Sequence, residues 1–555
     1  MGHVPSSRSI IGKFDYILVG AGSAGCVVAN RLSEDPSTKV LLLEAGGQDS
    51  YPWIHVPIGL FFCIGNARTD WHDMSEPEPG LNGRSIQIAR GRVIGGSSSI
   101  NGMIYIRGHA RDYDAWRDLG NEGWSWSSVL PYFRKSEDFF AGSDEAHGVG
   151  GPLRVEPVRV RWRPLNDFRE ACVQVGLPKT DDFNRGYAEG CGYVHVTQRR
   201  GRRWSAARAF LRPATHRSNL TVLTGAFTTR IVFKQGRAVG IEFSRGGVPC
   251  YAAAQREIIV SAGTFGSPQL LQLSGIGPRS LLREHGITVV RDLPGVGENL
   301  QDHLTTPFKV KLRDADTMNT RFNHPIKKAL MGMHYVVLRR GPMTSGAPPL
   351  TAFARSDPSR ETPNLQLFAD TLSFEKRGEL PQKFPVIAVA ICNLRPRSRG
   401  HVRIKSAQPS MPPAMLHNYL TDSDDQRVAL DSVKLLERIF NAPALSRYQP
   451  ARYMPPADLR SDAELLTAIR STASTAFHPV GTCKMGSDAN AVVDARLRVH
   501  GIEGLRVVDA SIMPTLISGN TNGPSIMIAE KAADMIKQDA FAPCAGQQVT
   551  ELVTS

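Results

Sequence analysis

The sequence predicts an α/β fold with two domains, one on a mostly parallel sheet assembled from discontinuous segments, and an α+β domain with an antiparallel sheet. The 555 residues are too many for one compact core. Short β-rich runs that end in small or acidic residues recur at 14–19, 256–263 and 504–509. Alternating apolar runs at 386–391 and 401–404 indicate antiparallel strands. We therefore expect the second domain to be inserted between pieces of the first.

The first element is a β-α-β unit at residues 14–44. An apolar run of strand length, 14–19, leads directly into the glycine-rich turn 20–25. A helical stretch follows, and a second apolar strand, 40–43, ends at Glu44. This order of strand, glycine-rich turn, helix and acid is typical of a Rossmann-like dinucleotide-binding unit.

Each part of this unit has a physical role. Gly20 allows the tight turn, Gly22 lets a pyrophosphate approach the backbone, and Gly25 lets helix and strand pack closely. The helix begins near Ser23, so its free N–H groups and dipole favour the phosphates. Glu44 can accept hydrogen bonds from a ribose diol and would repel a 2′-phosphate, but it does not separate NAD from FAD.

The composition is that of an ordinary globular protein, with 41% apolar and 21% charged residues. The formal net charge of +14 raises the question of a nucleic-acid partner. Basic residues gather at 159–163 and 199–203, but neither segment matches a nucleic-acid-binding motif. We predict no nucleic-acid partner and interpret these arginines as scattered surface residues. A basic entrance for an anionic substrate is the alternative.

The eight cysteines include no CxxC and no paired spacing, which predicts reduced thiols and no metal site. Residues 1–12 lack the sustained apolar stretch of a signal peptide, and no later run is long enough to span a bilayer. A cytoplasmic protein without a transmembrane segment is therefore expected. Peripheral contact with the inner face of the membrane stays open.

Five motifs follow in order along the rest of the chain. They are RGRVIGGSSSINGM at 90–103, GTFGSPQLLQLSGIG at 263–277, VGENLQDH at 296–303, HPVGTCKMG at 478–486 and SGNTNGPS at 518–525. Together with the first unit they resemble the glucose-methanol-choline (GMC) flavoprotein oxidoreductases over nearly the whole chain. The residues of these motifs most resemble those of the bacterial choline-dehydrogenase-like and alcohol-dehydrogenase branch.

This resemblance implies FAD as the cofactor. Backbone amides and hydroxyls of the 95–97 segment would contact the pyrophosphate and the isoalloxazine, and Asn101 and Gly102 would lie near flavin N5 and C4=O. The helix expected at 525–536, behind Pro524, would direct its positive dipole end at the flavin pyrimidine. The candidate cofactor-binding residues are Gly20, Gly22, Ser23, Gly25, Glu44, Arg92, Gly95, Gly96, Ser97, Asn101, Gly102, Met103, Ala262, Asp509, Asn522 and Pro524.

The placement of the strand-like runs predicts the division of the chain. The FAD-binding domain is expected at 13–158, 201–303 and 476–541. The substrate-binding domain is expected at 159–200 and 304–475.

Oxidation of an alcohol removes the hydroxyl proton and a hydride, so the protein must supply a base. Histidine suits this role near neutral pH. The family pairs a His with a second His or an Asn, which implies His478 as the base and Asn520 as hydrogen-bond donor to the developing alkoxide. Asn522 could exchange roles with Asn520, although a flavin contact suits it better. Some relatives carry a His that bonds covalently to the flavin where this chain has Ile100, so non-covalent FAD is expected.

The predicted activity is oxidation of an alcohol, primary in our interpretation, to the aldehyde, with electrons passed to a quinone-type carrier or to oxygen. A dehydrogenase is favoured over an oxidase. The alternative is a non-oxidative enzyme of the same fold, such as a hydroxynitrile lyase or a fatty-acid photodecarboxylase. No GxSxG elbow supports a serine hydrolase. A flavin-binding structural protein is a further option, and it would not be reduced by any alcohol.

The substrate is not specified by any motif. Choline would need an aromatic cage with a carboxylate. Phe368, Asp370, Phe374 and Glu375 have the right chemistry. We interpret Asp370 and Phe374 as ordinary sheet residues.

Overall fold

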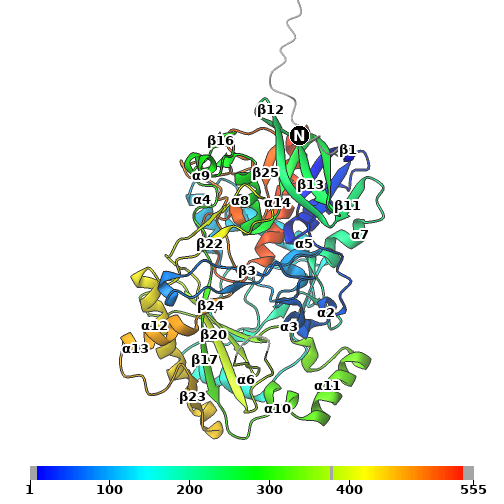
Figure 1. The fold of residues 1–555 in the computed structure, drawn as a ribbon. Coiled ribbons are helices and arrows are strands. Elements are labelled where there is room, and N and C mark those ends of the chain that lie inside the picture. The colour runs from blue at the N-terminus through cyan, green and yellow to red at the C-terminus, as the bar shows by residue number, and fades with distance from the viewer. Residues whose placement is uncertain (1–8, 376–378, 542–555) are drawn as a thin grey trace, which may run out of the picture.

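The computed structural model describes residues 9–375 and 379–541. Two lobes are stacked in Figure 1, and the chain crosses between them several times. The upper lobe contains a mixed sheet, and the lower lobe contains an antiparallel sheet. The predicted α/β fold is confirmed, because the mixed sheet is mostly parallel and draws on both ends of the chain.

The sheet of the upper lobe has the strand order β11-β2-β1-β14-β13-β12, with β25 beside β14. Its strands are β1 (Ser9–Val19), β2 (Val40–Glu44), β11 (Leu220–Thr224), β12 (Ala226–Lys234), β13 (Arg237–Arg245), β14 (Val248–Val260) and β25 (Leu505–Val507). The pairs of β1 with β2 and β14, of β2 with β11, and of β14 with β25 are parallel. The carboxyl ends of these strands therefore meet at one edge of the sheet.

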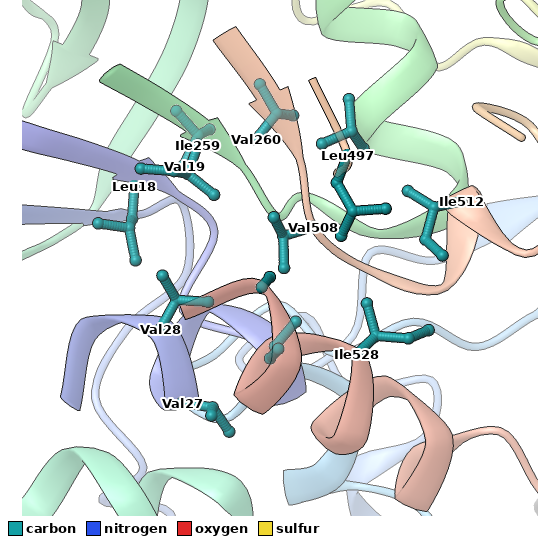
Figure 2. Close-up of a cluster of buried hydrophobic side chains, with 14 of the residues drawn as sticks. Leu18, Val19, Val27, Val28, Ile259, Val260, Leu497, Val508, Ile512 and Ile528 are labelled. Atoms are coloured by element: carbon teal, nitrogen blue, oxygen red, sulfur yellow. The ribbon is translucent and has the colours of Figure 1, made fainter. Parts of the chain in front are cut away.

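Two helices from opposite ends of the chain cover this sheet. The helices of this lobe include α1 (Ser23–Leu32), α4 (Ala110–Asp118), α5 (Trp126–Ser136), α8 (Gly263–Leu273), α9 (Arg279–Glu284) and α14 (Asn522–Phe541). Figure 2 shows Val28 of α1 facing Leu18 and Val19 of the sheet, and Ile528 of α14 lies near Ile512 in the same buried apolar cluster. The helix expected at 525–536 is thus part of α14.

The sheet of the lower lobe has the order β23-β17-β20-β19-β18-β7, and β24 also pairs with β17. Its strands are β7 (Gly190–Tyr193), β17 (Leu304–Lys311), β18 (Leu350–Ala354), β19 (Leu365–Asp370), β20 (Val386–Asn393), β23 (Ala451–Met454) and β24 (Ser474–Thr475). All of its pairs are antiparallel. The run 386–391 is therefore an antiparallel strand, as predicted.

Within the described residues, five helices belong to the lower lobe. They are α6 (Arg163–Gln174), α10 (Met318–Phe322), α11 (Pro325–Leu338), α12 (Ser423–Phe440) and α13 (Asp462–Thr472). Side chains of α6, α12 and α13, among them Phe168, Leu436 and Ile469, are buried with the strand residues Val310 and Val389 in one apolar core.

Short elements connect these parts. They are α2 (Pro52–His55), α3 (Leu60–Cys63), α7 (Arg212–Ala214), β3 (Asp73–Met74), β4 (Gln87–Ile88), β5 (Glu137–Phe139), β6 (Leu153–Pro157), β8 (His195–Val196), β9 (Gln198–Arg199), β10 (Arg202–Arg203), β15 (Ile276–Gly277), β16 (Arg291–Asp292), β21 (His401–Arg403) and β22 (Ala414–Leu416). Three single turns matter below: η1 (Pro57–Gly59), η3 (Gly96–Ser99) and η5 (Pro342–Thr344).

The assignment of the run 401–404 to the antiparallel sheet of the inserted domain was wrong. Strand β21 pairs only with β22, in a separate two-stranded sheet. Backbone hydrogen bonds join Gly400 to Leu300, and the Val402 N–H donates to the Gly297 carbonyl. The Gln272 amide of α8 also donates to the Val402 carbonyl, which holds this hairpin on the upper lobe.

The arginines at 199–203 are not all surface residues, which corrects that interpretation. Arg203 is completely buried, whereas Arg199 is exposed and stacks on Trp204. The seven cysteines of the described chain are free and buried, and Cys544 lies outside the described residues, as do residues 1–8. None of the described helices combines the length and the apolar character needed to cross a bilayer. The predicted domain boundaries stay a prediction.

Candidate active site

The glycine-rich turn after β1 forms one end of a cavity of about 1940 Å³ that extends into both lobes. Gly20, with φ of +100°, makes the tight turn, and Gly20, Gly22 and Ser23 line the cavity. Gly25 lies behind them. A Cβ at Gly25 would come within 1.9 Å of the Gly20 carbonyl oxygen, so only glycine lets α1 approach β1 this closely. The sequence predicted this packing role.

Glu44, at the end of β2, also lines the cavity. Its carboxylate oxygens accept hydrogen bonds from the backbone N–H groups of Gly46, at 2.7 Å, and Ala21, at 2.9 Å. Burial raises the pKa of the Glu44 carboxyl to about 7, against the lowering effect of these two bonds. Each oxygen retains a second acceptor position, which a ribose hydroxyl could use.

The loop that contains η3 forms the next wall. Gly96 lies so close to the first turn that a Cβ there would come within 2.7 Å of the Gly22 Cα. The predicted residues Arg92, Gly96, Ser97, Asn101, Gly102 and Met103 line the cavity. Gly95 does not line it, because its N–H donates to the Ala21 carbonyl and ties the loop to the turn.

Arg203 holds this loop from behind, a role that the sequence analysis missed. Its guanidinium donates to the Ser98 carbonyl and, at 2.9 Å, to Asn101 Oδ1, and also to the Ile54 carbonyl. Burial lowers the pKa of Arg203 to about 10. The basic run 199–203 gave no signal for this contact, because its partners are about a hundred residues or more away in the chain.

The ends of β14 and β25 complete the wall, with Ala262 and Asp509 both on the cavity surface. Asp509 Oδ2 accepts from the Gly263 N–H and from the Ser267 hydroxyl, which fixes the start of α8. From the last helix, Asn522 lines the cavity and accepts a 2.7 Å hydrogen bond from the Ser23 hydroxyl. Pro524 is buried in the first turn of α14 and does not line the cavity.

His478 and Asn520 meet where the two lobes join. Both line the cavity, and Asn520 Nδ2 lies 3.0 Å from His478 Nε2. The structure thus pairs His478 with Asn520, while Asn522 is bonded to Ser23. In the described chain, no group of three or more His, Cys, Asp or Glu side chains could hold a metal ion.

The comparisons with known proteins agree with this geometry. The family models of the GMC oxidoreductases match residues 14–305 with the N-terminal part and 396–529 with the C-terminal part. The chain belongs to the GMC oxidoreductase family.

Curated GMC relatives cover almost the full chain. A Pseudomonas putida protein named alcohol dehydrogenase (acceptor) is 41% identical over 531 residues, 94% of this chain and 95% of the relative. A Photobacterium profundum protein named oxygen-dependent choline dehydrogenase is 42% identical over 527 residues, 94% of this chain and 93% of the relative.

Solved GMC structures superpose closely. Pyridoxine 4-oxidase from Mesorbium loti has a TM-score of 0.86 and 32% identity, covering 95% of this chain and 99% of that one. Formate oxidase from Aspergillus oryzae RIB40, studied for its FAD modification, has a TM-score of 0.89 and 28% identity, with coverages of 95% and 99%.

The residues of this chain fit FAD. Glycine backbone, an acid for a ribose and the N-terminus of α1 lie along one wall of the cavity. Two buried hydroxyls on that wall, of Thr228 and Ser261, have no hydrogen-bond partner among the described residues, so they are available to a ligand. The contacts predicted for Gly20, Gly22, Ser23, Glu44 and the 92–103 loop stay predictions, as do the roles of His478 and Asn520.

A second histidine, His303, touches the first, and its role was missed. The VGENLQDH motif ends at this residue, but no chemistry was assigned to it. His303 Nδ1 lies 3.0 Å from His478 Nδ1, and His303 Nε2 lies 3.2 Å from the Leu394 carbonyl oxygen. A carbonyl only accepts, so His303 Nε2 carries the hydrogen.

The tautomer of His478 follows from this contact. Burial lowers the pKa of His303 to about 4, so its ring is neutral and its Nδ1 accepts the hydrogen carried by His478 Nδ1. Burial, with His303 and the charge of Arg90 adding to it, also lowers the pKa of His478 well below its ordinary value. His478 Nε2 therefore has a free lone pair, which accepts from Asn520 Nδ2.

Asn520 is oriented by the lower lobe. Its Oδ1 accepts from Gln366 Nε2 of β19 at 3.4 Å, so Nδ2 faces His478. The candidate base and donor are thus fixed by hydrogen bonds that extend from the Leu394 carbonyl to Gln366. The donor and the acceptor of this pair are arranged before any substrate binds.

The four residues considered for substrate recognition lie on the cavity wall. Of the two interpreted as ordinary sheet residues, Asp370 is the last residue of β19 and Phe374 lies outside the strand. Phe368 and Asp370 belong to β19, but Phe374 and Glu375 follow the strand, and all four line the cavity. Burial raises the pKa of the Asp370 carboxyl to about 7.

Proposed function

We propose that this protein oxidises an alcohol to the aldehyde with FAD, using His478 Nε2 as the base. The observation that carries the proposal is the placement of His478 on the cavity wall, with Nδ1 3.0 Å from His303 Nδ1 and Nε2 3.0 Å from the amide of Asn520. The oxidation of CH–OH donors also agrees with the names of the curated relatives. These names do not favour the non-oxidative alternative.

The geometry suits the removal of a proton and a hydride from one carbinol. A substrate hydroxyl that replaces the Asn520–His478 contact would donate its hydrogen to His478 Nε2, while Asn520 Nδ2 donates to the oxygen. The resulting imidazolium keeps its Nδ1 hydrogen on His303, whose lone pair stabilises the new charge. Bound FAD supplies the acceptor for the hydride.

The direct test is anaerobic mixing of the holoenzyme with a panel of alcohols while flavin absorbance is recorded. Bleaching by at least one alcohol in the dark supports the proposal. Bleaching by none, with a lyase or light-driven decarboxylase activity instead, would contradict it.

We expect His303 to act as a positioning residue. His303→Leu removes the acceptor of His478 Nδ1–H, so the ring loses its fixed tautomer and flavin reduction slows about tenfold, the equivalent of one hydrogen bond. His303→Asn keeps an acceptor oxygen and should recover part of the rate. Stopped-flow reduction across pH measures both variants. Equal rates and pH profiles for Leu, Asn and wild type would contradict the role.

We infer that FAD is bound without a covalent link. Ile100 lines the cavity and has no nucleophilic atom, and among the described lining residues there is no Cys or Tyr and no His besides His478. Acid precipitation should therefore release all flavin colour into the supernatant. Colour that stays in the washed pellet of wild type and disappears in His478→Ala would identify a link through that residue.

We infer that electrons pass to a quinone-type carrier rather than to oxygen. The relative at 41% identity is named alcohol dehydrogenase (acceptor), which supports a carrier, whereas the relative at 42% identity is named oxygen-dependent and does not. The oxidases among the solved structures are less similar, at 28% and 32% identity. Turnover with a phenazine-type dye should exceed turnover with dissolved oxygen. Equal rates, with one hydrogen peroxide formed per alcohol oxidised, would make the protein an oxidase. A cytoplasmic location stays a prediction.

A further inference from the structure

Most of the apolar side chains of helix α11 face solvent, whereas a helix on the surface of a lobe normally buries them. Only Met331 and Tyr335 of its 14 residues are buried. Ile326, Leu330, Met333 and Val337 are between 51% and 70% exposed. Figure 1 shows α11 at the outer edge of the lower lobe.

These four of the six exposed large apolar residues of α11 form one continuous stripe, the α11 outer face; the other two are Val336 and Leu338. The four residues of the face follow each other at spacings of four, three and four residues, which places them along one side of the helix. Met331 and Tyr335 lie on the opposite side, and the Tyr335 hydroxyl donates to the Gly201 carbonyl, which attaches α11 to the body of the protein. A contiguous apolar stripe of this kind marks an interaction surface.

The charges that flank the α11 outer face are predominantly positive, since the Asp316 carboxylate, which also acts on Lys327, is paired with Arg321. Lys327 and Lys328 lie in its first turn, and Arg339 and Arg340 follow its last. No Asp or Glu occurs in residues 317–356. A partner for this surface therefore needs an apolar layer bordered by negative charge.

We propose that α11 docks the protein on an anionic lipid bilayer, lying in the plane of the interface. An apolar face bordered by cations is the pattern of interfacial helices, in which the face enters the acyl boundary and the cations contact the headgroups. At about 1.5 Å per residue, 14 residues extend about 21 Å along the surface. A second copy of this chain fits less well, because it would bring the same four cations together.

The chain segments on either side of the docked helix form part of the cavity wall. Cavity-lining residues occur just before α11, at Met318 and Phe322, and just after it, at Pro342 and Ser345. Phe62 of α3 also lines the cavity and is half exposed. Docking through the α11 outer face therefore brings the cavity next to the lipid surface.

Flotation of the holoenzyme with lipid vesicles tests the proposal. Wild type should float with vesicles of equimolar phosphatidylglycerol and phosphatidylcholine, and added salt should weaken this binding. The double variant Leu330→Glu with Val337→Glu places two acids on the α11 outer face and should reduce the bound fraction about tenfold or more. Val248→Glu is the matched control, since Val248 is 50% exposed on the upper lobe, and it should float like wild type.

A second variant tests whether the positive charges beside the α11 outer face are required for binding. Lys327→Ala with Lys328→Ala and Arg340→Ala keeps the apolar stripe and should lose most binding to anionic vesicles and most of the salt dependence. The variants alter exposed side chains, so flavin content and thermal unfolding should match those of wild type. Failure of wild type to float, or equal flotation of all variants, would overturn the proposal. A dimer that Leu330→Glu with Val337→Glu dissociates, without vesicle binding, would assign the face to a second copy.

Discussion

His478→Ala is expected to leave FAD bound and to slow anaerobic flavin reduction by a good alcohol about 10²- to 10⁴-fold, the usual loss for a general base. The imidazole joins His303 to Asn520 and has a lone pair on Nε2, which can accept the hydroxyl proton. FAD stays bound because His478 is at the junction of the lobes, away from the glycine-rich turn. Stopped-flow absorbance measures the rate.

Two further variants make this test specific. Asn520→Ala removes the donor but keeps the base, so it should cost less, about 10- to 100-fold. His500→Ala is the matched control, since the His500 ring bonds the Gly486 carbonyl, away from the cavity wall, and should reduce at the wild-type rate. Near-normal reduction by His478→Ala would remove His478 from the role of base.

Gly25→Ala is expected to abolish most FAD binding. Its Cβ would come within 1.9 Å of the Gly20 carbonyl oxygen, so α1 must move away from β1 and carry the Gly22–Ser23 segment with it. Overpacking of this kind costs about 1–3 kcal/mol, and the displaced turn no longer presents its N–H groups to the phosphates. The ratio of flavin to protein absorbance after purification measures the loss.

Gly22→Ala distinguishes an effect on cofactor binding from an effect on the stability of the fold. A Cβ at Gly22 meets no atom within 4 Å, so the flavin-free protein should unfold at the wild-type temperature. FAD affinity should still fall at least tenfold, because the new methyl group projects into the space predicted for the pyrophosphate. Gly332→Ala, also without a neighbour within 4 Å, is the control for the substitution itself. Wild-type FAD affinity in Gly22→Ala would place the pyrophosphate elsewhere.

The sequence predicted the fold where one short segment contains the whole pattern of a functional motif. The first β-α-β unit has a strand, a glycine turn and an acid in 31 consecutive residues, so its structure follows from local rules, and β1, α1 and β2 appear where expected. The run 401–404 alternates like a strand, yet its sheet was misassigned. This segment is held by hydrogen bonds to the backbone of Gly297 and Leu300, which are about a hundred residues away in the chain.

The sequence predicted the site residues that lie in motifs. It did not predict the residues that hold them in place through hydrogen bonds. His478 and Asn520 stand in sequence motifs, and the structure brings them to 3.0 Å. Arg203 and Gln366 act on those motifs through contacts over 102 and 154 positions, which no spacing rule reveals. His303 lay inside a recognised motif, but its chemistry became visible only through its distance to His478.

The pairing of α1 with α14 has a consequence for biosynthesis. The Ser23–Asn522 hydrogen bond joins residues 499 positions apart, and the cavity wall needs both. A chain emerging from the ribosome presents its glycine-rich turn first, and Asn522, which bonds to that turn, is made near the end of synthesis. For nearly all of its synthesis the nascent protein therefore lacks the part of the cavity wall that the last helix supplies. The complete cofactor site forms only after that helix has been made.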